Sequence, residues 1–173
     1  MKFRTVARTV AFAIALAVLL SLLSACLGRE APSASLVLSE MLAFEKDCPA
    51  GTVYLASAGE GETGYFSESF CAALYGDGEV PAEWASVVDF AIFQSASPSP
   101  AELAVFRAIG RAEAEEVAEM CVRRLSVLRR FYRGTDLESY TSGGRVVILG
   151  RYVVMAVSSD AETAVEEARA ALR

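Results

Sequence analysis

Cysteine is the residue type with the most evident chemistry here, because the 173 residues include four cysteines and no histidine. The missing histidine removes the commonest general base, the commonest metal ligand and every nucleophile scheme that needs an imidazole. The cysteines Cys26, Cys48, Cys71 and Cys121 are too widely spaced for the clustered pattern of a zinc site. We therefore expect no bound metal, no catalytic residue and no enzymatic activity.

Cys26 follows a segment with the layout of a secretory signal. Three basic residues precede an apolar run that closes on Leu23-Ser24-Ala25-Cys26, and small residues before a cleavage site are typical of such signals. These four residues resemble a bacterial lipobox, which implies a diacylglycerol on Cys26 and cleavage just before it. The alternative is an uncleaved anchor, but residues 10–25 are fewer than the roughly 20 that cross a bilayer.

The leader divides the chain into three parts. We expect a helical lipoprotein signal peptide at 1–25, a short tether at 26–35 and one globular domain at 36–173. Removing 25 of the 173 residues leaves 148, which is enough for one domain with a sizeable core. Because two acyl chains hold a protein firmly to a bilayer, we expect the mature protein on the extracytoplasmic face of the cell membrane.

Charge limits the partners. The leader holds three of the 16 basic residues and none of the 22 acidic ones, so cleavage leaves 13 against 22, a net charge of −9. Such a surface repels nucleic acid. Besides the membrane, we expect an extracytoplasmic protein or a small ligand as partner, and no cofactor apart from the covalent diacylglycerol.

Two of the three thiols that remain after Cys26 are candidates for a disulfide bond. Cys48 and Cys71 flank a predicted strand and loop, and such residues pair in oxidising compartments. This pair raises an alternative function, an envelope thiol redox sensor. Cys121 lies among the apolar positions of a predicted helix, where a thiol is typically a small buried side chain.

Two further patterns have competing interpretations. Residues 59–64 fit G-x-G-x-x-G, but Glu60 and Glu62 would repel a pyrophosphate, so we favour an acidic loop over a nucleotide site. Asp89 interrupts an apolar strand. It either pairs with Arg107 on a neighbouring strand or points to solvent by strand alternation, and we favour the solvent-facing interpretation.

The elements that would position these residues indicate an α+β domain. Four or five mainly antiparallel strands are expected, with helices packed on one face. The final helix should be capped by Ser159 or Asp160. The pattern predicts strands at 52–57, 87–93, 102–108, 145–149 and 152–157, and helices at 36–44, 67–75, 111–132 and from the cap to 172.

Aromatic residues gather in the middle third of the chain. Most should be core, but we expect some of those between Tyr65 and Tyr75 to be exposed. Exposed aromatic side chains are typical of recognition surfaces. We expect an interaction surface at Tyr65, Phe66 and Tyr75.

Three segments resemble a known family. Glu102-Leu103-Ala104-Val105-Phe106, the long charged helix after it and Gly150-Arg151-Tyr152-Val153-Val154 are similar to motifs of bacterial lipoproteins of the domain-of-unknown-function family 4358, found mainly in Clostridia. The likeness is best after Trp84, and 48–64 matches less well. It implies a lipobox leader joined to one domain, without any catalytic residue to carry over.

Together these observations favour a membrane-tethered binding or interaction module without catalysis. A carboxylate-based hydrolase of cell-wall or sugar polymers remains an alternative, since such enzymes need only two suitably spaced acids.

Overall fold

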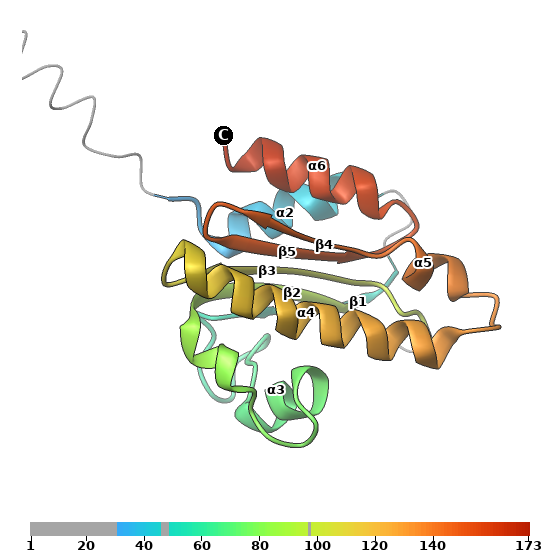
Figure 1. The fold of residues 1–173 in the computed structure, drawn as a ribbon, viewed down its shortest axis with the longest axis horizontal. Coiled ribbons are helices and arrows are strands. Elements are labelled where there is room, and N and C mark those ends of the chain that lie inside the picture. The colour runs from blue at the N-terminus through green and yellow to red at the C-terminus, as the bar shows by residue number, and fades with distance from the viewer. Residues whose placement is uncertain (1–30, 46–48, 97) are drawn as a thin grey trace, which may run out of the picture. The chain divides into compact units, whose positions relative to one another are not determined.

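The computed structural model describes residues 31–45, 49–96 and 98–173, and its domain extends from Pro32 to Arg173 (Figure 1). The lipobox, Cys26 and Cys48 lie outside the described residues. The elements are α2 (Ala34–Phe44), β1 (Gly51–Leu55), α3 (Glu68–Tyr75), the 3-10 helix η1 (Ala82–Ser86), β2 (Val87–Ser95), β3 (Glu102–Ala108), α4 (Arg111–Tyr132), α5 (Glu138–Ser142), β4 (Arg145–Leu149), β5 (Tyr152–Val157) and α6 (Ala161–Ala171).

The five strands form one antiparallel sheet in the order β1-β2-β3-β5-β4. β3 is therefore central, and its Phe106 stands opposite Phe90 of β2 on one side and Val153 of β5 on the other. The predicted α+β class and the predicted sheet of four or five mainly antiparallel strands are confirmed.

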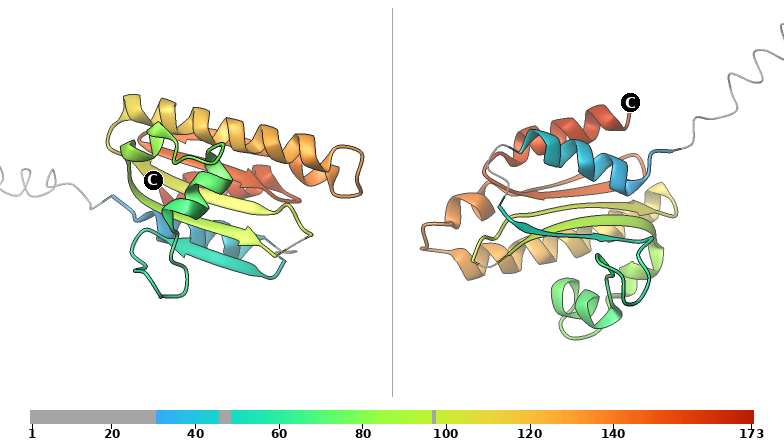
Figure 2. Two further views of the ribbon diagram at one scale, coloured as in Figure 1. Left: turned by 90° about the horizontal axis from the view of Figure 1, so that it is seen from below. Right: turned by 180° about the vertical axis from the view of Figure 1, so that it is seen from behind.

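Helices cover both faces of the sheet, so the expected one-sided packing was wrong (Figure 2). α2 and α6 lie against one face, whereas α4 lies against the other, with α3 and η1 beside it. The reason lies in β3 and β5: every residue of β5 is buried, and in β3 all but Arg107 are. A strand that is apolar on both sides needs cover on both.

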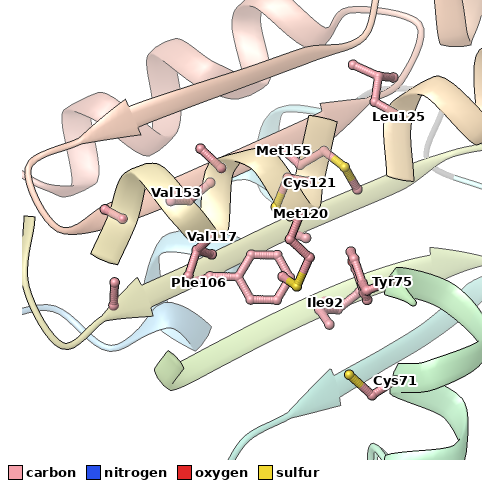
Figure 3. Packing of buried hydrophobic residues seen from close by; sticks show 14 of the residues in the cluster. Cys71, Tyr75, Ile92, Phe106, Val117, Met120, Cys121, Leu125, Val153 and Met155 are labelled. Atoms are coloured by element: carbon pink, nitrogen blue, oxygen red, sulfur yellow. The ribbon is translucent and has the colours of Figure 1, made fainter. Parts of the chain in front are cut away.

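The core between the sheet and α4 is built from fully buried apolar side chains (Figure 3). Phe106 and Val153 from the sheet meet Val117, Met120 and Cys121 from α4, and none of the five has exposed surface. Burying an apolar side chain of this size contributes about 1.5–3 kcal/mol to folding. Cys121 thus has the buried position that its place on the helix predicted.

Helix caps correct one predicted boundary and decide another that the pattern left open. α2 begins at Ala34, inside the expected tether, because the Ser33 side chain accepts a hydrogen bond from the Leu36 N–H at 3.2 Å. α6 is capped by Asp160, whose carboxylate accepts from the Thr163 N–H at 3.1 Å, so Asp160 fills the role offered to Ser159 or Asp160. Such caps satisfy the unpaired N–H groups of a first helical turn.

Candidate functional site

A buried polar network joins β3, α3 and α4. The Glu102 carboxylate is 1% exposed; it accepts a hydrogen bond from the Tyr75 hydroxyl at 2.8 Å. Its other oxygen accepts from Nε and a terminal nitrogen of Arg124, at 3.0 and 2.6 Å. Two donors thus compensate a carboxylate that would otherwise be costly to bury.

The network fixes the protonation of its members. Burial and the Glu102 carboxylate raise the pKa of Tyr75 well above its ordinary value. Burial by itself would lower the pKa of Arg124, but the charge and hydrogen bonds of Glu102 outweigh burial and raise it. The phenol therefore stays neutral and the guanidinium stays charged across the physiological range.

An open groove lies over this network, between α4 and the segment that leaves α3. Its volume is about 740 Å3, and Tyr75 and Arg124 line it. We call it the α3–α4 groove; its other lining residues are Leu74, Gly76, Asp77, Glu79, Val80, Pro81, Ala82, Glu83, Val122, Arg123, Ser126, Val127 and Arg130. Both apolar and charged side chains line it, so it offers both kinds of contact to a ligand.

An ion pair closes one border of the groove. A terminal nitrogen of Arg123 on α4 lies 2.7 Å from a carboxylate oxygen of Glu83 on η1. A backbone hydrogen bond and this guanidinium lower the pKa of Glu83, although partial burial acts in the opposite direction. Glu83 is therefore ionised and already paired.

The wall of the groove that faces α4 is the chain after α3, and its conformation requires glycine at two positions. A Cβ at Gly76 would lie 1.8 Å from the carbonyl oxygen of Glu79, so any larger residue would collide with the returning backbone. Gly78 has φ +96°, a left-handed conformation that glycine adopts without strain. These two positions allow the tight turn between α3 and Pro81 that forms this wall.

The expected interaction surface is contradicted at two of its three residues. Phe66 and Tyr75 are buried, at 8% and 4% exposure, in a cluster of aromatic rings that includes Trp84 and Phe90. The physical reason is that the chain after Gly64 folds its rings back onto β2 and β3. Tyr65 remains exposed, and it borders a separate shallow depression with Phe70.

The thiols of the described residues are buried. Burial, and to a lesser extent the charge of Glu68, raise the pKa of Cys71 to about 12, and burial raises that of Cys121 further. Cys71 carries a free thiol in the structure, while Cys48 lies outside the described residues. The Cys48–Cys71 disulfide therefore stays a prediction.

Asp89 does not point to solvent as we favoured. It stands opposite Arg107 in the sheet, 3.6 Å from its guanidinium, and accepts a hydrogen bond from the Ala34 N–H at 2.9 Å. The bulge in β2 next to Asp89 breaks the simple alternation on which the solvent-facing interpretation relied. The alternative pairing with Arg107 is the one observed.

In the glycine-rich loop at 59–64, a side chain of the loop itself binds a backbone N–H group. The Gly59 N–H donates to the Glu62 carboxylate at 2.7 Å, which occupies a donor that a phosphate would need. Gly64 is required for another reason, since a Cβ there would lie 2.6 Å from the Val53 carbonyl oxygen. These contacts fit the acidic-loop interpretation.

Sequence reasoning missed the roles of Glu102 and Arg124. The available signal was that Arg124 lies three residues after Cys121 and four before Leu128, both of them buried positions of α4. A charged residue between buried positions needs a buried partner, and Glu102 begins β3, in which every residue but Arg107 is buried. Within the described residues, no group of three or more acidic or cysteine side chains is arranged to hold a metal.

Comparison with known proteins found no matching family model, no similar curated protein and no similar solved structure. The resemblance to family 4358 therefore depends on the quoted motifs alone. Within the described ranges, every helix is too short or too polar to cross a bilayer.

Proposed function

We propose that this protein is a lipid-anchored, extracytoplasmic binding module without catalysis, and that its partner or ligand binds in the α3–α4 groove. The observation that carries the proposal is the groove of about 740 Å3, in which Arg124 and Glu83 are already paired inside the domain. Such a groove recognises a partner by shape, apolar contact and fixed charge. The membrane address depends on Leu23-Ser24-Ala25-Cys26, as the sequence alone indicates.

The directions of the pKa shifts support binding over catalysis. General acids and bases need pKa values near the working pH. Each shift resolved among the described residues runs away from neutrality: upward for Cys71, Tyr75, Cys121 and Arg124, and downward for Glu83.

The two alternative functions have less support. A hydrolase acid needs a raised pKa, whereas the pKa of Glu83 is lowered and Glu102 is tied to Arg124. A thiol sensor needs an accessible thiol with a lowered pKa, whereas Cys71 is buried and its pKa is raised to about 12.

The groove is tested by photo-cross-linking in intact cells. A photoreactive residue replaces Val127 in the groove or Ile148 on β4; the two native side chains are 41% and 42% exposed. We expect a discrete adduct from position 127 that is absent from position 148. If position 127, and then Val122 and Val80, gave no adduct beyond that of position 148, the groove would not be the binding site.

A further inference from the structure

The chain enters the domain at one end of the sheet and is fixed there by two hydrogen bonds. The Tyr152 hydroxyl donates to the Pro32 carbonyl at 2.5 Å, and the Ala34 N–H donates to Asp89 at 2.9 Å. Arg107 stands between Asp89 and Tyr152 in the sheet register. The end of the tether is thus attached to β2 and β5, close to the first residues of the domain.

Three chain connections meet at this same end (Figure 1). The Ile109 N–H donates to the Ser86 carbonyl and the Ala108 N–H donates to the Arg151 carbonyl, both at 2.9 Å. These bonds bring together the start of β2, the β3–α4 connection and the β4–β5 turn.

The surface formed by these connections is apolar and basic. Ile109 is 58% exposed and Val88, at the bulge of β2, is 51% exposed. Arg111 and Arg151 are also exposed, and among the described residues no carboxylate pairs with either. We call Val88, Ile109, Arg111 and Arg151 the tether-end surface.

The length of the tether determines which end of the domain reaches the membrane. From Cys26 to Pro32 the chain advances six residues, which span at most about 20 Å whatever their conformation. Among the residues that the structure describes, the large apolar side chain with the highest exposure is Phe131, at 76%, and it lies at the other end of α4. That helix is 22 residues long, so Phe131 lies roughly 30 Å along α4 from Arg111 and the tether-end surface.

Arginines lie at both ends of α4, so the short tether, and not charge alone, selects the tether end. A domain with a net charge of −9 is repelled by a bilayer that contains anionic lipid. At the tether-end surface Asp89 is paired with Arg107, which leaves the guanidinium groups of Arg111 and Arg151 to face lipid phosphates. The carboxylate of Glu113, in the first turn of α4, lies beside Gly110, and Glu115 and Glu116 follow it along the helix.

We propose that the tether-end surface rests on the membrane that holds the lipid anchor. Val88 and Ile109 enter the interfacial layer, and Arg111 and Arg151 contact phosphate groups. The inference rests on the proposed lipidation of Cys26. It also separates the α3–α4 groove from the tether-end surface, because Val127 of the groove lies 16 residues, about 24 Å, along α4 from Arg111.

The test places a tryptophan at each end of α4 in the full lipidated chain. Ile109→Trp and Phe131→Trp proteins are reconstituted into vesicles of phosphatidylethanolamine and phosphatidylglycerol with brominated acyl chains, which quench tryptophan on contact. The native protein, with Trp84 as its single tryptophan, gives the baseline. We expect at least twofold more quenching for Ile109→Trp than for Phe131→Trp.

Charge-reversal variants test the arginines. Arg111→Glu with Arg151→Glu should reduce the quenching of Ile109→Trp to the Phe131→Trp value. Arg133→Glu with Arg145→Glu, the same charge change at exposed positions outside the tether-end surface and the groove, should leave it unchanged.

Three outcomes would overturn the inference. Equal quenching at positions 109 and 131 in a protein whose mass shows the lipid would overturn this inference alone. A blue shift at position 109 without lipid quenching, together with a doubled particle mass, would assign the surface to a second copy. A protein that lacks the lipid would overturn both this inference and the proposed function.

Discussion

At the residue scale, Glu102 connects the core to the α3–α4 groove. Its carboxylate holds Tyr75 at the end of α3 and Arg124 in the middle of α4. Both partners line the groove, so the shape of its floor depends on this one buried charge. The energetic consequence is asymmetric, because removing one member leaves the other charged and buried.

Glu102→Gln should therefore destabilise the domain strongly. It leaves Arg124 buried without a counter-charge, and we expect the free energy of unfolding to fall by about 3–5 kcal/mol. Glu83→Gln is the matched control; its pair with Arg123 is more exposed and should contribute about 0–1 kcal/mol. Urea denaturation of the mature chain with Cys26→Ala measures both, and equal small losses would contradict the role of Glu102.

Because of the Cys71 thiol, the free energy of unfolding of the domain should depend on pH in the alkaline range. The thiol has an ordinary pKa of 9.0 that burial raises to about 12, so the unfolded state ionises first as pH rises. Stability is fully present below about pH 9 and should be lost progressively toward pH 12, since the folded state then binds the extra proton.

Denaturation of the native protein and of Cys71→Ala at several alkaline pH values isolates this contribution, because the raised pKa values of Tyr75 and Cys121 affect both proteins alike. The variant should lose stability less steeply. Equal slopes would show that Cys71 does not titrate as a free thiol, which is the result expected if the predicted disulfide with Cys48 forms.

At the element scale, periodicity was enough where the pattern was long. β3, α4, β4 and β5 begin and end at the predicted residues, because apolar runs and a charged helix surface define them without help from the rest of the fold. The faces of the sheet were misjudged, although the unbroken apolar runs of β3 and β5 are typical of strands buried on both sides.

The candidate site was less predictable than the elements. Glu102 and Arg124 are 22 residues apart, and nothing local in either segment fixes their pairing. The groove is likewise formed between α4 and the connection after α3, two segments brought together only by tertiary packing. Tyr75 was selected for its exposure, but it contributes to the site through a buried hydroxyl.

Gly76→Ala tests the glycine wall of the groove. The added Cβ would meet the Glu79 carbonyl at 1.8 Å, so the turn must move and we expect a loss of about 1–3 kcal/mol. Gly59→Ala is the control, since its nearest neighbour would be a flexible Glu62 oxygen at 3.6 Å. Both are compared by urea denaturation and by cross-linking at position 127; unchanged values for Gly76→Ala would contradict the close approach.

At the scale of the whole molecule, we propose an acidic domain held at one end by a lipid, with its groove along the helix that extends from that end. Cys26 is the residue on which this account depends most, since the anchor defines both the location and the orientation. If Cys26 carries the proposed lipid, the six residues from it to Pro32 hold the domain close to the membrane surface.

The most direct test is the intact mass of the protein in the membrane fraction of cells that express the full chain, with Cys26→Ala alongside. We predict a mature species that begins at Cys26 and carries the mass of a diacylglycerol, and the loss of that species in the variant. An unmodified precursor of the same mass range in both samples would contradict the lipid-anchored account.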